Sequence, residues 1–173
     1  MRLGGDGIFF MLALAAMVFM GSAAARTWRH ATLTERSKSQ AEQLSHWMAA
    51  AHAAGRGQDF LPQACAAPQP LAETSPRWGA CAQALMADAG PLGAMRNAFT
   101  GAPLQLIDKC KPGQAATVGQ LVLEKLMPPV PGTSTPAAAV PLVEGDALAP
   151  ALALRLQVCD AAGYAIHVAD LDF

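Results

Sequence analysis

An uninterrupted apolar run near the amino terminus limits what this chain can fold into more than any other feature. The residues from Ile8 to Ala25 (IFFMLALAAMVFMGSAAA) include no charged side chain. As a helix with a rise of about 1.5 Å per residue, this run would be about 27 Å long, close to the thickness of the hydrocarbon layer of a membrane. A helix that is apolar on every side needs lipid or a large protein core around it. The sequence therefore predicts a helix that spans a membrane or packs among other apolar helices.

A cleaved secretory signal is a second interpretation of the same residues. Arg2 precedes an apolar core that runs from Ile8 to Met20, and the small residues from Gly21 to Ala25 suit the pocket of signal peptidase. A buried helix of a soluble core is a third interpretation, which the uniformly apolar surface of the run disfavours. The first two interpretations differ in whether the run stays attached to the rest of the chain.

Basic residues lie mainly after the apolar run, which bears on its orientation in a membrane. Arg26, Arg29, Arg36 and Lys38 follow the run, and only Arg2 precedes it. Taken literally, the positive-inside rule would keep the carboxyl end in the cytoplasm. We nevertheless expect export, because long domains translocate largely regardless of flanking charge and because the cysteines favour an oxidising compartment.

The segment after the apolar run has the composition and the periodicity of an amphipathic helix. Residues 26–54 contain no proline and are rich in Ala, Glu, Gln, Lys and Arg, which are strong helix formers. One helix is therefore predicted from about residue 8 to residue 54, with Gly55 and Gly57 as its stop. An amphipathic helix that simply begins a soluble domain is the alternative. The side chains that fall at helical spacing on one side are Leu33, Ser37, Gln40, Ala41, Leu44, Trp47, Met48 and Ala51.

Segments with strand periodicity follow in the second half of the chain. Ala151–Val158 and Tyr164–Val168 alternate with period two and are separated by a turn, which predicts a hairpin. Leu104–Lys109 and Val118–Leu126 read as two further strands joined through a Lys-Pro-Gly turn. A four-stranded antiparallel sheet with one apolar face needs a second layer, which the amphipathic half of the long helix can supply. The expected fold class is α+β, with a long amino-terminal helix packed on this sheet.

Prolines divide the remaining chain. Four prolines between Leu61 and Pro76 predict a surface loop, and a short helix is expected at Trp78–Ala89, ended by a Gly-Pro pair. The run from Pro128 to Pro141 is proline-rich and uncharged, which favours an extended, exposed loop.

All four cysteines follow the apolar run. Their even number favours two disulfides in an oxidising compartment, with three pairings possible. We expect the sequential pairing, in which the first bond closes a short loop and the second ties neighbouring strands. A zinc site is disfavoured because the sequence has no C-x-x-C, and free cysteines in a cytoplasmic protein are the other alternative. The expected pairs are Cys65 with Cys81 and Cys110 with Cys159.

This order of elements, an apolar helix continuing into an amphipathic one, then a loop and a sheet with a late cysteine pair, resembles the architecture of type IV pilins. The amino terminus is similar as well, since the short segment MRLGGDG ends in glycine directly before Ile8. The resemblance implies cleavage by a prepilin peptidase between Gly7 and Ile8, with Gly5 as a second choice. It divides the chain into a leader at 1–7, an apolar helix at 8–25, and a head at 26–173 that includes the amphipathic helix 26–54.

Two departures from the pilin pattern affect what the resemblance implies. The leader contains one basic residue together with Asp6, and the glutamate usual at the fifth mature position is replaced by Leu12. In the family, that carboxylate is thought to meet the amino terminus of a neighbouring subunit within the apolar fibre core, where an unpaired charge is costly. The resemblance therefore implies a minor pilin or a pseudopilin. The run from Leu92 to Leu106 also resembles the Asn-aromatic-Gly stretch of conjugative thin-pilus tip subunits, and a turn at Asn97 and Gly101 is the simpler interpretation.

Residue patterns typical of catalysis, metal binding or nucleic-acid binding are absent from the sequence. The chain has 12 basic and 13 acidic residues, so no excess of positive charge favours a nucleic acid. There is no G-x-S-x-G, and the glycine clusters lack the preceding strand of a dinucleotide loop. We therefore expect no enzyme, cofactor or metal. The histidines His30, His46, His52 and His167 are expected at the surface, as are Asp108, Glu124, Asp160, Asp170 and Asp172 unless the fold pairs them.

The sequence thus leads to one expectation and two alternatives. The expectation is a structural subunit of a type IV pilus or a type II secretion-like filament, held first in the inner membrane and then in a periplasmic or extracellular filament. Its partners would be other pilin subunits, a prepilin peptidase and the inner membrane. The first alternative is a secreted periplasmic binding module released after Ala25, and the second is a membrane-anchored assembly factor whose helix stays uncut. Small residues that would let neighbouring helices approach closely are Ala13, Ala15, Ala16 and Gly21.

Overall fold

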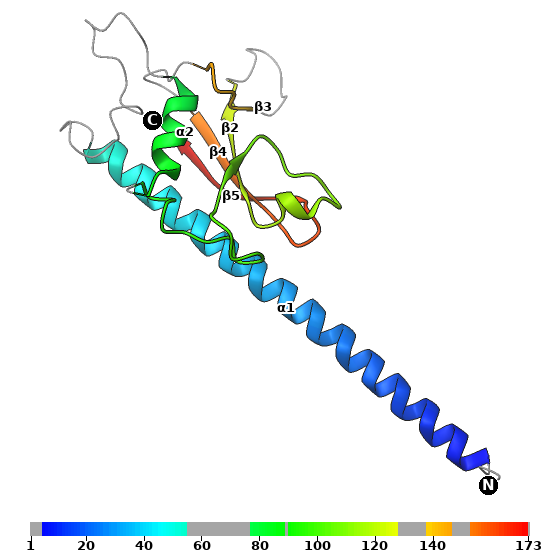
Figure 1. Cartoon of the computed structure of the whole chain (residues 1–173). Coiled ribbons are helices and arrows are strands. Elements are labelled where there is room, and N and C mark those ends of the chain that lie inside the picture. Colours follow the sequence, from blue (N-terminus) through cyan, green and yellow to red (C-terminus); the bar gives the residue numbers. More distant parts are fainter. Residues whose placement is uncertain (1–4, 55–76, 89, 128–137, 147–152, 173) are drawn as a thin grey trace, which may run out of the picture.

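The structure, a computed structural model, describes residues 5–54, 77–88, 90–127, 138–146 and 153–172, and among these the side chains at 5–9, 51–54 and 172 are not described. It combines one long helix with a mixed sheet of about five strands and a short second helix (Figure 1). The predicted α+β class is therefore confirmed. The helices are α1 (Gly5–Ala54), α2 (Trp78–Met86) and the short 3-10 helix η2 (Ala115–Thr117), and the strands are β1 (Leu106–Ile107), β2 (Leu121–Leu126), β3 (Ala139–Pro141), β4 (Ala153–Cys159) and β5 (Ala165–Asp172).

Helix α1 is a single rod of 50 residues that joins the apolar and the amphipathic segments without a break. Figure 1 shows its carboxyl-terminal part lying along the sheet and α2, while its amino-terminal part projects well beyond them. The helix ends at Ala54, directly before the glycine predicted as its stop, so the predicted extent is confirmed to within a few residues at both ends. No proline lies between Ile8 and Ala54, so no residue of this segment lacks the N–H that the helical hydrogen bonds require.

One face of the carboxyl-terminal half of α1 is buried against the sheet. Ser37, Ala41, Leu44 and Met48 recur at spacings of three and four residues, so they lie on the same side of the helix. Leu33, Gln40 and Trp47 are half-buried beside them, and α1 contacts both β4 and β5. This face is the one that the sequence pattern predicted, except that Ala51 lies among the side chains that are not described. The helix therefore supplies the second layer that the sheet requires.

The sheet has the order β1-β2-β4-β5, and β3 pairs with β2 off this path. The hairpin of β4 and β5 is antiparallel, as predicted, with a bulge in the pairing at Leu156 and Gln157. The predicted antiparallel pairing of the two earlier strands is wrong, because β1 runs parallel to β2. Between them the chain passes through a turn and η2 and returns to the end of the sheet from which β1 starts, so both strands point the same way.

The prediction of four strands is also wrong, because residues predicted as loop form β3. Residues 139–141 of the proline-rich run pair antiparallel with Glu124, Lys125 and Leu126. Strand β3 lies at the edge of the sheet and ends in Pro141, and an edge position tolerates proline because no neighbour there requires its missing N–H. The two short strands β1 and β3 thus share the same edge of β2, one along each half. The rest of the predicted loop, residues 128–137, lies outside the described residues.

The core lies between the sheet, α1 and α2. The predicted short helix is confirmed at Trp78–Met86, three residues shorter than expected, and buries Trp78, Cys81, Ala82 and Leu85. These side chains belong to the same apolar cluster as Leu44 of α1 and as Leu121, Leu123, Leu154, Leu156 and Val158 of the sheet. The helix is anchored by its backbone, because the N–H of Trp78 donates to the carbonyl of Asp146 (2.8 Å) and that of Gly79 donates to Glu144 (3.0 Å). The loop predicted at 61–76 lies outside the described residues.

Candidate functional site

The projecting half of α1 carries most of the exposed large apolar side chains in the described part of the chain. Its large side chains are exposed by 47% at Leu14 and by up to 75% at Phe19. Exposed apolar patches larger than a few hundred Å² usually mark a surface that contacts a partner or a membrane. The exposed large apolar side chains of this half are Phe10, Met11, Leu12, Leu14, Met17, Val18, Phe19, Met20 and Trp28.

By length and composition, α1 can cross a membrane. Within the described residues it is the one helix with this property, and none of its most apolar stretch is buried. The absence of burial argues against the interpretation as a core helix of a soluble domain. A signal sequence near the amino terminus has the same length and composition, so this property leaves the choice between an anchor and a cleaved signal open.

The residues predicted for helix packing and for processing lie on the projecting rod. Ala13, Ala15, Ala16 and Gly21 are all exposed, and a Cβ placed on Gly21 would meet no atom within 4 Å. At 100° per residue, Ala13 and Ala16 lie near one another on the helix surface, whereas Ala15 and Gly21 point elsewhere. These four residues therefore form no single small-residue stripe. Gly7 and Ile8 lie in the first turns of α1, and cleavage between them stays a prediction.

The head is tied together by disulfides. Cys110 and Cys159 form the second predicted pair, which links the loop after β1 to the end of β4. Cys81 of α2 is also disulfide-bonded. Its predicted partner, Cys65, lies outside the described residues.

A buried asparagine, Asn97, organises the loop between α2 and β1. Its Nδ2 donates to the carbonyl of Val118 (2.7 Å), and its Oδ1 accepts from the amide N–H groups of Phe99 (2.9 Å) and Thr100 (3.2 Å). Gly101 has φ +71°, and its N–H donates to the carbonyl of Asn97, so the predicted turn at Asn97 and Gly101 is confirmed. The sequence did not indicate that Asn97 also reaches the segment before β2.

Gly119 makes the hydrogen bond from Asn97 to Val118 possible. Its φ is +71°, and a Cβ there would lie 2.6 Å from Oδ1 of Asn97. Both the backbone conformation and the lack of space therefore require glycine at this position. Gln40 of α1 donates from Nε2 to the carbonyl of Arg96 (2.8 Å), so the same loop is also attached to the long helix.

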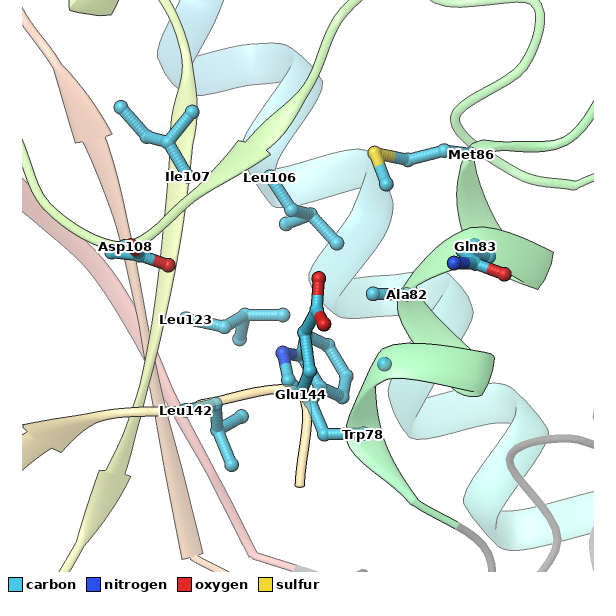
Figure 2. A pocket seen from close by; sticks show the side chains of 11 residues that line it. Trp78, Ala82, Gln83, Met86, Leu106, Ile107, Asp108, Leu123, Leu142 and Glu144 are labelled. Carbon is cyan, nitrogen blue, oxygen red and sulfur yellow. The ribbon is translucent and has the colours of Figure 1, made fainter. Parts of the chain in front are cut away.

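A small pocket of about 130 Å³ lies between α2 and the edge of the sheet shared by β1 and β3. Figure 2 shows apolar side chains from α2 and the strands around it, with the Glu144 side chain extending across the space and Asp108 on the side of β1. Neither carboxylate has a hydrogen-bond or ion-pair partner among the residues that the structure covers. Both are exposed, so water solvates them and nothing here raises their reactivity. The apolar lining comes from Trp78, Ala82, Met86, Leu106, Leu123 and Leu142.

An ion pair fixes the loop that holds the amino end of α2. Nζ of Lys125 lies 2.9 Å from Oδ1 of Asp146, and the other carboxylate oxygen accepts from the N–H of Val143 (3.0 Å). The N–H of Val143 and, next, the ammonium of Lys125 hold the pKa of Asp146 below its ordinary value of 3.8. Both side chains are mostly buried, with 29% of Lys125 and 19% of Asp146 exposed, so the pair is less screened than a typical surface ion pair.

Replacing Asp146 with asparagine is expected to lower the free energy of unfolding at pH 7 by about 1–2 kcal/mol, since a hydrogen bond to a charged group is lost. The carboxyl has a lower pKa in the folded than in the unfolded chain. Its contribution to the free energy of unfolding is therefore present above the pKa of the unfolded chain and is lost as the pH falls through the pKa of the folded chain. Denaturant unfolding of the full chain in detergent, repeated from pH 7 to pH 2, measures both effects. Asp88→Asn, at an exposed carboxyl, is the matched control and should change neither the stability at pH 7 nor its dependence on pH. If Asp146→Asn lowered the free energy of unfolding equally at pH 7 and at pH 2, the prediction would be contradicted.

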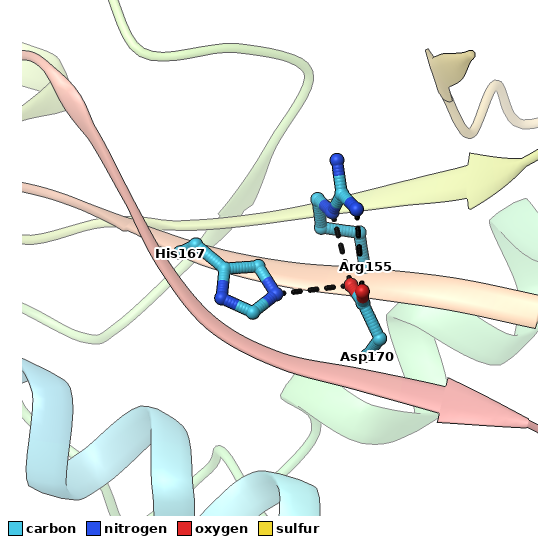
Figure 3. Close-up of polar contacts among 3 residues, drawn as sticks. All are labelled: Arg155, His167 and Asp170. Carbon is cyan, nitrogen blue, oxygen red and sulfur yellow. Dashed lines mark hydrogen bonds and ion pairs between the residues drawn. The ribbon is translucent and has the colours of Figure 1, made fainter. Parts of the chain in front are cut away.

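A second charged cluster lies on the sheet surface that faces away from α1. Arg155 of β4 donates from Nε and from one terminal nitrogen to the two oxygens of Asp170 of β5, at 2.9 and 3.2 Å. Nε2 of His167 lies 3.0 Å from Oδ1 of the same carboxylate. Figure 3 shows His167 and Arg155 both directed at Asp170. The hydrogen bonds with Arg155 lower the pKa of Asp170 and raise that of Arg155. Since Asp170 is 43% exposed, this cluster is a surface ion pair of small energetic effect.

The carboxylates that were expected at the surface unless the fold paired them are only partly brought together. Glu124 lies opposite Arg155, which lies opposite Asp170, so the two carboxylates are separated by a cation. Oδ1 of Asp160 accepts from Ala162 and Tyr164 and closes the hairpin turn, while the side chain of Asp172 is not described. Within the described residues, no group of three or more His, Cys, Asp or Glu side chains could hold a metal ion.

The histidines occupy separate places. His30 and His46 lie exposed on α1, and His167 is exposed on β5. The side chain of His52 is not described. The three described histidines therefore show no common site.

The chain matches no protein-family model, and comparisons with curated proteins and with solved structures give no match either.

Proposed function

We propose that this chain is a structural subunit, a minor pilin or pseudopilin, of a type IV pilus or a type II secretion-like filament. Its projecting apolar rod would stay in the inner membrane until a prepilin peptidase removes the leader. The rod would then pack among the rods of other subunits, with the head on the outside of the filament.

The observation that supports this proposal is the division of one unbroken helix into two halves with different surroundings. The carboxyl-terminal half buries Ala41 and Leu44 completely against the head. The amino-terminal half contacts nothing in the described head and presents apolar side chains on every side. A rigid rod of this kind can exchange lipid for other apolar helices without any refolding of the head, because van der Waals packing serves in both surroundings.

The residue at position 12 favours a minor subunit over the major one. Leu12 is exposed on the rod and cannot form an ion pair with the amino terminus of a neighbour. In the major subunit, this ion pair would fix how each subunit is placed against its neighbour. A subunit that cannot form the ion pair would not be added repeatedly along the filament. It would suit a low-copy position, such as the filament tip.

Processing at the amino terminus tests the proposal. When the full chain is expressed together with a prepilin peptidase, sequencing of the mature protein is expected to give Ile8 as the first residue. Gly7→Val should block cleavage and leave the leader attached, whereas Gly4→Val is the control and should be cleaved normally. A mature protein that starts at Arg26 would show cleavage by signal peptidase and would contradict the filament proposal.

A secreted binding module is the second candidate, and the pocket beside α2 favours it. The volume of about 130 Å³, lined by apolar side chains together with Asp108 and Glu144, could take a group the size of a small ring or a short side chain. In this case the module would begin after Ala25 and would be released by osmotic shock, whereas the filament subunit would stay with the membranes.

A further inference from the structure

A short exposed segment of α1 separates the apolar rod from the head. We call residues 26–31 the collar. All six are helical and exposed, and Trp28 is 74% exposed. The collar begins directly after the uncharged run that ends at Ala25, and it ends where Thr32 becomes half-buried by the head.

The length of the collar corresponds to one specific layer of a membrane. At about 1.5 Å per residue, six helical residues span about 9 Å. The polar layer on each side of a bilayer is about 5–8 Å thick, half the difference between the total and the hydrocarbon thickness. With the apolar run in the hydrocarbon layer, the collar would cross the headgroups and the head would begin just above them.

The side chains of the collar are of the kinds that bind at this depth. Arg26 and Arg29 are three residues apart, so they lie on the same side of the helix, with His30 beside Arg26 and Trp28 on the other side. An exposed tryptophan favours the interface, because its ring is apolar and its N–H finds a polar partner there. Arginine can extend its aliphatic part along lipid and place its guanidinium among phosphates.

The charge of the collar favours anionic lipid. No acidic residue lies between Ile8 and Thr34, and Glu35 is the first to follow the apolar run. Neither Arg26 nor Arg29 has an ion-pair partner in the part of the chain that the structure describes. Two unpaired guanidinium groups at the depth of the phosphates leave a positive charge that a negatively charged headgroup would neutralise.

We propose that the collar is a binding site for anionic phospholipid headgroups, formed by Arg26 and Arg29 with Trp28 as an interfacial anchor. This inference rests on the proposed function, because it requires α1 to remain in a membrane. It adds that the subunit selects its lipid surroundings before assembly and that the head is held at a fixed height above the phosphates. Each arginine near an anionic surface strengthens association about fivefold.

Spin-labelled lipids test the inference with the full chain in vesicles of phosphatidylcholine and phosphatidylglycerol. We expect wild-type protein to associate with spin-labelled phosphatidylglycerol at least about fivefold more strongly than with phosphatidylcholine, and less so at high salt. Arg26→Gln combined with Arg29→Gln should remove the preference. Arg36→Gln combined with Arg77→Gln removes the same charge from exposed positions further along the chain and is the matched control. This variant should keep the preference for phosphatidylglycerol.

The outcomes separate this inference from the proposed function. Extraction with alkaline carbonate first establishes whether the chain is held in the vesicles. Release of wild-type protein would overturn both proposals, because there would be no membrane span. Retained protein without a preference, or with a preference that survives the collar substitutions, would overturn the inference alone. The inference is also overturned if the substitutions impair filament assembly and leave the lipid preference unchanged, since the collar would then bind protein.

Discussion

Replacing both Leu14 and Val18 with arginine is expected to remove the chain from the membrane fraction. The two positions lie four residues apart near the middle of the apolar run, and both are exposed on the projecting rod. An arginine at the centre of a spanning helix costs about 2.5–3.5 kcal/mol, so the pair is expected to disfavour insertion by about 5–7 kcal/mol. A helix barely long enough to span has no alternative apolar segment to insert. Resistance to alkaline carbonate extraction measures the effect.

The matched control places the same charges at the same spacing on the other half of the rod. Ser39→Arg combined with Gln43→Arg affects two exposed positions beside the head, so the variant should stay with the membranes like wild type. If the Leu14 and Val18 variant resisted extraction as well as the control does, the apolar run would not be the membrane anchor.

Removing the bond between Cys110 and Cys159 is expected to have the largest effect on the stability of the head. The two cysteines are 49 residues apart, and the chain-entropy relation gives about 4 kcal/mol for a closed loop of that length. Cys110→Ala combined with Cys159→Ala should lower the free energy of unfolding by about that amount, measured by denaturant unfolding in detergent. The buried position of Cys159 makes alanine a better replacement than serine, which would bury a hydroxyl group.

Lys109→Ala is the control for this prediction, because it changes an exposed neighbour of Cys110 and leaves the bond in place. It should alter the free energy of unfolding by less than about 0.5 kcal/mol. A loss below about 1 kcal/mol for the double alanine variant would contradict the prediction, because it would mean that the unfolded chain gains little freedom when the bond is removed. Wild-type protein denatured without a reducing agent should contain no titratable thiol, as expected if both predicted bonds form.

The helix and the hairpin were predictable from the sequence because their signals are local. Helical spacing from Leu33 to Met48 identified the buried face of α1, and alternation along β4 identified the strand whose Leu154, Leu156 and Val158 are buried. In both cases the side chains that determine the structure are close together along the chain. The second predicted cysteine pair is also confirmed. Cys110 directly follows one predicted strand and Cys159 directly follows another, so the sequence already placed both cysteines beside the sheet.

The rest of the sheet depends on contacts between distant residues, which no local pattern reports. Strand β1 has only two residues, and its parallel direction follows from the path that Asn97, Gly119 and the disulfide impose on the chain before β2. Strand β3 lies in a proline-rich run and pairs only because β2 offers the free half of its edge. The Lys125–Asp146 pair and the pocket likewise join separate segments, so only the apolar rod among the candidate sites was visible from composition.

The position of β5 affects how heads behave when many are crowded at one surface. Among the described strands β5 has a single neighbour, β4, so its eight residues form a long open border of the sheet. Such a border can pair with its counterpart on another copy and start aggregation. The bulge opposite Leu156 and Gln157 bends this border, and the charged and polar side chains of Asp170 and His167 lie along it. These features oppose edge-to-edge addition, so copies of the head can be concentrated without fusing their sheets.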